Sequence, residues 1–154
     1  MEMPQLTAGH RQLERLVGTW QGRETMYPSQ WDPQGGTAEG VSRVRTALGG
    51  FAAIVDYEQS RYGQVVFSGH GVYTFDSEAG DIVLHWFDCM GSPPEVFRGR
   101  FDGDRLTVTS RNPMGFARLV YDHSEKGVLR SSMQMSPDGE SWSTLFDGLY
   151  RRAD

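Results

Sequence analysis

The sequence predicts an all-β protein, a ten-stranded antiparallel up-and-down barrel preceded by one short helix. Ten β-rich runs follow residue 18, and turn residues separate each run from the next. The separators are too short for the crossover of about a dozen residues that parallel strands require, so neighbouring runs are expected to pair antiparallel. Ten such strands leave no unpaired edge if they close into a barrel. Residues 1–154 are expected to form one domain.

Only the segment before residue 18 has a helical period, which predicts a helix over residues 8–16. Its apolar residues Leu13 and Leu16 fall on one side together with His10. Thr7 precedes the segment as an N-cap, although no Glu or Gln occupies the capping-box position.

The strands are expected where short apolar and β-branched runs lie between turn residues. Their ranges are 18–27, 39–47, 51–61, 64–75, 81–88, 95–101, 104–111, 114–122, 128–136 and 140–152. The connecting segments include the turn-forming sequences Y-G, S-E-A-G, D-G, S-E-K-G and S-P-D-G. The registers of these hairpins predict which side chains face inward, because paired residues share a face of the sheet.

Two hairpins late in the chain give a consistent apolar interior. A two-residue loop at D-G pairs Phe101 with Asp104, and a turn at P-D-G pairs Ser136 with Ser141. Leu145 and Leu149 would then face outward, a weak indication of a homodimer contact. The residues expected inside these two hairpins include Phe97, Gly99, Leu106, Val108, Leu129, Ser131, Met133, Met135, Trp142, Phe146 and Tyr150.

The S-E-A-G hairpin is expected to pair Asp76 with Asp81. One face then carries Tyr73, Phe75, Ile82, Leu84 and Trp86. His70 and His85 lie on the other, less apolar face, so they are interpreted as outward residues and not as a metal site.

The Y-G hairpin has two possible registers. A two-residue loop at Tyr62 and Gly63 sends Asp56 and Glu58 inward, whereas a bulged three-residue loop sends Val55 and Tyr57 inward. The second register is favoured, because burying two carboxylates without partners costs several kcal/mol.

The start of the first strand, L-V-G-T-W, resembles the calycin superfamily, which includes lipocalins and fatty-acid-binding proteins. In that superfamily the Trp of a G-x-W motif closes one end of the barrel and packs against an Arg of the last strand. The resemblance therefore implies that Trp20 packs against Arg151 or Arg152, and strand alternation favours Arg152.

A closer resemblance covers about residues 10–110. Its elements are L-V-G-T-W-Q-G, R-T-A-L-G-G-F at 45–51, F-S-G-H-G-V-Y-T-F-D at 67–76 and W-F-D-C-M-G at 86–91. Together they look like a bacterial calycin-like family known only as a domain of unknown function. The resemblance implies a barrel with an internal cavity and no established reaction.

A partial resemblance links G-T-W-Q-G-R-E-T-M-Y-P at 18–28 to nitrobindins, which are ten-stranded haem barrels. Their haem is bound through a His late in the chain. Here the last histidine, His123, falls at a strand end or turn, so haem is disfavoured as a cofactor and no other cofactor is expected.

Several polar side chains are candidates for chemistry in or near the cavity. Glu24 follows the inward alternation of Trp20, and Asp88 continues that of Trp86, although each also has a structural interpretation at a rim or turn. Arg45 alternates with Arg43 and can either bind an anionic head group or belong to a solvated face. The full set of expected ligand-binding residues is Trp20, Glu24, Arg45, Tyr57, Tyr73, Trp86, Asp88, Phe97, Tyr121, Met133 and Phe146.

Composition excludes several other classes of function. The formal net charge of -5 argues against general nucleic-acid binding. One cysteine, Cys89, excludes an internal disulfide framework. The sequence shows neither a signal peptide nor an apolar run long enough to span a membrane, so a cytoplasmic location is expected.

These observations predict a protein that binds a small, largely apolar molecule inside a barrel. A carboxylate on this molecule is compatible with the prediction. The first alternative is an enzyme that uses Glu24, Asp88 or a buried pair of Asp56 and Glu58. The others are a haem protein and a filled barrel with a structural role.

Overall fold

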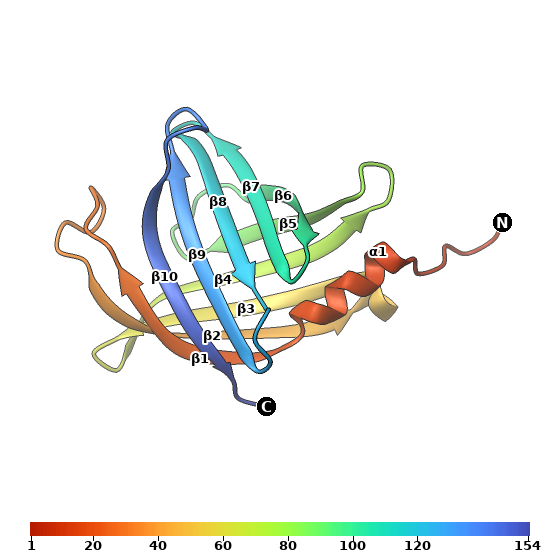
Figure 1. Ribbon diagram of the computed structural model, residues 1–154, viewed down its shortest axis with the longest axis horizontal. Coiled ribbons are helices and arrows are strands. Elements are labelled where there is room, and N and C mark those ends of the chain that lie inside the picture. The colour runs from red at the N-terminus through yellow and green to blue at the C-terminus, as the bar shows by residue number, and fades with distance from the viewer.

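The computed structural model describes residues 1–154 and shows a closed antiparallel barrel of ten strands, with a short helical segment before it (Figure 1). Each strand pairs with its neighbours in sequence, and β10 returns to pair with β1, so no edge remains unpaired. The predicted fold class is confirmed. The strands are β1 (Gly18–Met26), β2 (Gly36–Ala47), β3 (Ala52–Arg61), β4 (Gln64–Asp76), β5 (Asp81–Asp88), β6 (Glu95–Asp102), β7 (Arg105–Asn112), β8 (Gly115–Asp122), β9 (Val128–Ser136) and β10 (Ser143–Arg152).

The helical segment begins as predicted but changes character after one turn. Helix α1 spans Ala8–Arg11, and a 3-10 helix, η1, continues over Gln12–Leu16. The backbone N–H of Thr7 donates a hydrogen bond to His10 Nδ1 at 3.1 Å, so a histidine takes the place that Glu or Gln has in a capping box. Neither helix has the length and apolar character needed to cross a bilayer.

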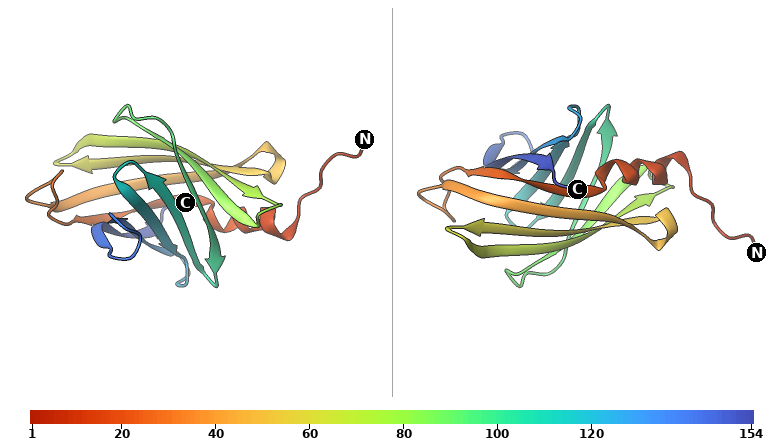
Figure 2. Two further views of the ribbon diagram at one scale, coloured as in Figure 1. Left: turned by 90° about the horizontal axis from the view of Figure 1, so that it is seen from above. Right: turned by 90° about the horizontal axis from the view of Figure 1, so that it is seen from below.

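The barrel has two unlike ends, at opposite extremes of the molecule in Figure 2. The helical segment lies at one end, which we call the closed end. The loop of residues 27–35 between β1 and β2 lies at the other, which we call the mouth. The loop of residues 89–94 between β5 and β6 also belongs to the mouth, because antiparallel strands alternate in direction.

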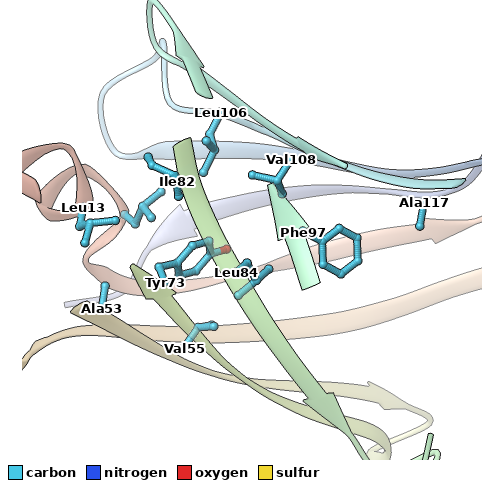
Figure 3. Packing of buried hydrophobic residues seen from close by; sticks show 11 residues of the cluster. Leu13, Ala53, Val55, Tyr73, Ile82, Leu84, Phe97, Leu106, Val108 and Ala117 are labelled. Atoms are coloured by element: carbon cyan, nitrogen blue, oxygen red, sulfur yellow. The ribbon is translucent and has the colours of Figure 1, made fainter. Parts of the chain in front are cut away.

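The main hydrophobic core fills the closed end, as Figure 3 shows. Leu13 and Leu16 enter it from the helical segment and are 2% and 4% exposed. His10 packs at the edge of this core, and its ring lies edge-on to the rings of Phe51 and Phe75 at centroid distances of 4.9 and 5.3 Å. Trp20 is buried beside this core, and the Arg152 guanidinium lies 5.7 Å from its ring centroid, which confirms the expected pairing.

The predicted register of the D-G hairpin differs from the observed one by two residues. Phe101 pairs with Leu106 instead of Asp104, because Asp102 and Arg105 extend the ladder and the turn is made by Gly103 and Asp104. A shift of two keeps every side chain on its expected face. The pairing of Asp76 with Asp81 is confirmed, and His70 and His85 are exposed on the outer face.

A bulge between Thr144 and Phe146 changes the start of β10. It corrects two predictions, because Leu145 lines the interior together with Phe146. Trp142 instead lies outside, where the Arg118 guanidinium stacks 3.9 Å from its ring centroid. Only Leu149 remains of the proposed outer apolar pair, and it is 43% exposed.

The hairpin between β3 and β4 combines parts of both expected registers. Its loop is the two-residue turn Tyr62–Gly63, and a bulge between Gln59 and Ser60 then shifts the pairing, which places Tyr57 opposite Gly69. Tyr57 therefore faces inward, whereas Asp56 and Glu58 are exposed on the outer face. Asp56 pairs there with His70 at 2.7 Å, so the alternative of a buried Asp56–Glu58 pair is wrong.

Candidate functional site

A cavity of about 450 Å³ lies inside the barrel between the core and the mouth. Its walls are mainly aromatic and aliphatic side chains, with a few polar groups among them. Proteins bind small molecules in concave, mostly apolar sites of this kind and size. The cavity is therefore the candidate functional site.

Most of the residues expected at the site do line this cavity. They are Trp20, Tyr57, Tyr73, Trp86, Asp88, Phe97, Tyr121, Met133 and Phe146. The alternation of strands explains this agreement, since a register shift of two leaves the facing of each residue unchanged.

Arg45 was expected at the site, and this expectation is wrong. On β2 the even-numbered residues Ser42 and Val44 line the cavity. Arg45 and its neighbour Arg43 project from the opposite face and are exposed. The solvated interpretation of these two arginines is the one that the structure bears out.

Glu24 faces inward but lies behind the cavity wall, where it is 0% exposed. Tyr57 Oη donates to its two carboxylate oxygens at 2.8 and 2.6 Å, and Gln59 Nε2 donates to Oε1 at 3.0 Å. Tyr150 Oη donates to Oε2. These three partners are neutral, and they satisfy a carboxylate that would otherwise be costly to bury. We call Glu24, Tyr57, Gln59 and Tyr150 the carboxylate cage.

Strand pairing and glycine make room for the carboxylate cage. Glu24 lies opposite Ala38 on β2 and Gly148 on β10. A Cβ atom at Gly40 would lie 2.6 Å from Glu24 Oε2, and one at Gly148 would collide with the Tyr150 hydroxyl. Residues larger than glycine at these two positions would therefore displace the cage.

The two phenols of the cage are held in their protonated form. Burial raises the pKa of Tyr57 well above its ordinary value, and the neighbouring Glu24 carboxylate raises this pKa further. The same two causes, in the same order, raise the pKa of Tyr150. Both hydroxyls therefore remain donors to Glu24 at physiological pH.

A second polar group lies at the mouth, where β5 ends and β6 begins. Asp88 Oδ2 accepts a hydrogen bond from Trp86 Nε1 at 3.0 Å, and its Oδ1 accepts one from the backbone N–H of Met90 at 3.0 Å. Asp88 thus both shapes the turn and lines the cavity. Glu95 pairs with Trp86 across the strands and accepts a hydrogen bond from Asn112 Nδ2 at 3.2 Å.

The loop of residues 27–35 forms one side of the mouth. Ser29 Oγ accepts hydrogen bonds from the backbone N–H groups of Trp31 and Asp32. Asp32 in turn forms a 2.8 Å ion pair with Arg61 of β3. These contacts hold Trp31 over the cavity, although it is 56% exposed.

His123 lines the cavity near the closed end, directly after β8. Its ring is edge-on to Trp20 at a centroid distance of 5.5 Å. Burial lowers the pKa of His123, and the nearby Arg15 lowers it further, so the imidazole is neutral at physiological pH.

Sequence reasoning missed several members of the site. Gln59 follows Tyr57 by two residues, so alternation along β3 was a sufficient signal for it once the register was chosen. Glu95 precedes Phe97 by two residues in the expected strand 95–101, so the same alternation was a signal for it. Trp31 carried no such signal, because it lies in a loop. The lone thiol, Cys89, is exposed and accepts a hydrogen bond from the backbone N–H of Ser68 at 3.3 Å.

Two solved structures share this fold over nearly their whole length. The crystal structure of Rv2717c from M. tuberculosis has a TM-score of 0.73 at 17% identity, covering 97% of this chain and 100% of that chain. The S-type phycobiliprotein lyase CPES from Guillardia theta has a TM-score of 0.62 at 11% identity, with 98% and 99% coverage. No curated protein matches the chain. The family described as "Protein of unknown function (DUF1579)" matches residues 5–152.

Proposed function

We propose that this chain, which belongs to the DUF1579 family of proteins of unknown function, holds a small, largely apolar molecule inside its barrel. The observation that carries this proposal is the cavity of about 450 Å³ between the core and the mouth. Ten strands enclose a wider interior than the eight that side chains alone can fill. The closed barrel that opens with G-T-W also supports placing the chain among calycin-like proteins.

The arrangement of the polar residues favours binding over catalysis by a carboxylate. Glu24 was a candidate catalytic group, but it is sealed behind Tyr57, Gln59 and Tyr150 and does not line the cavity. Asp88 is held by Trp86 and by the turn at Met90. Glu24 therefore acts best as a support behind the binding wall, and Asp88 as a fixed part of that wall.

The lining does not fit haem, the cofactor of the nitrobindins. His123 is the histidine on the cavity wall, and its ring packs against Trp20 at the closed end. The charged residues at the mouth are Asp32, Asp88 and Glu95, which would repel the propionate groups of a haem. No step of the proposed function involves haem.

A fluorescence titration with the neutral probe N-phenyl-1-naphthylamine tests the binding proposal. We expect saturable binding of one probe molecule per chain, because the probe is apolar and becomes fluorescent in a dry site. Ser42 lines the cavity and makes no side-chain hydrogen bond, so Ser42→Phe should fill the space and abolish this binding.

Thr37→Phe is the matched control, because Thr37 lies on the same strand but is exposed on the outer face. The control should bind the probe like the unmodified protein. Absence of saturable binding, or equal binding by Ser42→Phe at retained thermal stability, would refute the proposal. Native mass spectra of the purified protein would show directly whether a molecule of defined mass copurifies.

A further inference from the structure

We propose that the molecule bound in the cavity is a lipophilic amine, with a protonated nitrogen held near the mouth and an apolar body inside the barrel. This inference rests on the proposed function and names the class of its ligand. Three features of the cavity carry it, namely the charges of its wall, the direction of its hydrogen bonds and its aromatic faces.

The formally charged residues that line the cavity are all acidic. They are Asp32, Asp88 and Glu95, and the wall contains neither lysine nor arginine. Arg61 neutralises Asp32 from behind at 2.8 Å. Asp88 and Glu95 have only neutral hydrogen-bond partners, so their charges remain uncompensated at the mouth. A cation placed between them would gain attraction in a partly desolvated site, whereas an anion would be repelled.

The carboxylate cage gives the deeper wall the same preference. Tyr57 and Tyr150 turn their hydroxyl hydrogens toward Glu24, and Gln59 turns its amide nitrogen the same way. The donors of this wall are therefore committed to a group behind it. Each phenol oxygen also accepts one hydrogen bond, Tyr57 Oη from Gln59 Nε2 at 3.2 Å and Tyr150 Oη from Ser131 Oγ at 3.4 Å, and keeps one further lone pair. At the cage itself, a ligand therefore meets phenol oxygens as acceptors, which suits a donor group.

Aromatic rings lie between the cage and the two mouth carboxylates. The ring of Tyr57 lies 6.1 Å from that of Phe67 and 6.4 Å from that of Trp86, measured between centroids. Trp86 also donates its indole N–H to Asp88, which joins the aromatic group to the acidic one. The faces of such rings attract an ammonium group, and desolvation strengthens this attraction.

Three probes with the same alkyl chain separate charge from apolarity: decylamine, 1-decanol and decanoate. Each is titrated at neutral pH against bound N-phenyl-1-naphthylamine, below its micellar concentration. We expect decylamine to displace the dye on the order of tenfold more strongly than decanol, because a charged hydrogen bond is added to the same apolar contact. Decanoate is expected to be the weakest.

The double variant Asp88→Asn, Glu95→Gln removes the two mouth charges and keeps the size of both side chains. It should lose the preference for decylamine, measured as the ratio of the decylamine affinity to the decanol affinity of the same variant. The matched control is Asp56→Asn, Glu58→Gln, which removes two exposed charges from the outer face of β3 and should keep the preference.

The outcomes separate this inference from the function on which it rests. Binding of decanol or decanoate at least as strong as that of decylamine overturns the amine and leaves the cavity proposal intact. A preference for decylamine that survives in the mouth variant, or vanishes in the outer-face control, also overturns it. Failure of all three probes and of the dye overturns both proposals.

Discussion

At the scale of single residues, Glu24 shows how a buried charge-bearing group is accommodated without a salt bridge. Its carboxylate is 0% exposed and accepts hydrogen bonds from Tyr57, Gln59 and Tyr150. Each of these hydrogen bonds adds little to the net free energy of unfolding, because the unfolded chain makes equivalent hydrogen bonds with water. Removing one costs more, because the carboxylate stays buried with an unfilled site.

Tyr57→Phe should therefore destabilise the protein at neutral pH, by about 1.5–3 kcal/mol, since the lost hydrogen bond is one to a carboxylate. Urea unfolding followed by tryptophan fluorescence measures this change in the free energy of unfolding. Tyr62→Phe is the control, because the Tyr62 side chain is exposed in a turn, and it should change stability by less than about 0.5 kcal/mol. Equal stabilities of the two variants would show that the cage does not support Glu24.

At the scale of elements, the hairpin between β3 and β4 has a turn of two residues, and the backbone of both lies in the left-handed region. Tyr62 has φ of 52° and Gly63 has φ of 75°. The pattern suits the right-handed twist of a two-residue hairpin, but only glycine adopts it without strain. A tyrosine in this conformation is uncommon, and its side chain is fully exposed, so packing does not compensate for the strain.

Tyr62→Asn should raise the free energy of unfolding by about 0.5–1 kcal/mol, because asparagine tolerates the left-handed region better than tyrosine. Gly63→Ala should lower it by about 1 kcal/mol, since an added Cβ meets no atom within 4 Å and only the backbone is strained. Thermal melts of both variants measure the two opposite signs. Shifts of the same sign would contradict this account of the turn.

Side-chain alternation was enough to predict the faces of most strands, but not their exact registers. Phe97, Tyr121 and Met133 face inward as expected, since a two-residue error in a turn leaves facing unchanged. The bulge in β10 was not predicted, because an extra residue within a strand leaves no trace in composition. The bulge at Thr144 reversed the expected facing of Trp142 and Leu145 for this reason.

The candidate site was only partly predictable on the same grounds. The carboxylate cage depends on how β1, β3 and β10 are aligned with one another around the barrel. Alternation along β1 therefore suggested Glu24 but did not identify its partners. Trp31 lies in a loop held by Ser29 and by the ion pair of Asp32 with Arg61. Such loops have no periodicity from which facing can be inferred.

At the scale of the whole molecule, the barrel buries several phenols around one interior. Burial raises the pKa of Tyr57, Tyr73, Tyr121 and Tyr150. In the unfolded chain these groups ionise near their ordinary pKa of about 10. The folded protein then retains more protons than the unfolded chain above that pH, so alkaline conditions favour unfolding.

We propose that residues 1–154 unfold as one unit. Below about pH 9 the phenols are protonated in both the folded and the unfolded chain, so they make the free energy of unfolding no more or less dependent on pH. Above about pH 10 the free energy of unfolding should fall by about 1.4 kcal/mol per pH unit for each buried phenol. Urea unfolding at a series of pH values measures the slope. Tyr57→Phe should reduce this slope by the contribution of one phenol, about 1.4 kcal/mol per pH unit. An unchanged slope in this variant would show that Tyr57 is not one of the phenols that stay protonated in the folded protein.

The closed end, filled by the core around Leu13 and Leu16, has a consequence for the timing of binding. With one end plugged, a molecule bound as proposed would leave the cavity by the route through which it entered. Arrival and departure then share a single barrier at the loops of residues 27–35 and 89–94. A change there that does not touch the bound molecule slows both rates by the same factor, so residence time can be tuned while affinity stays constant.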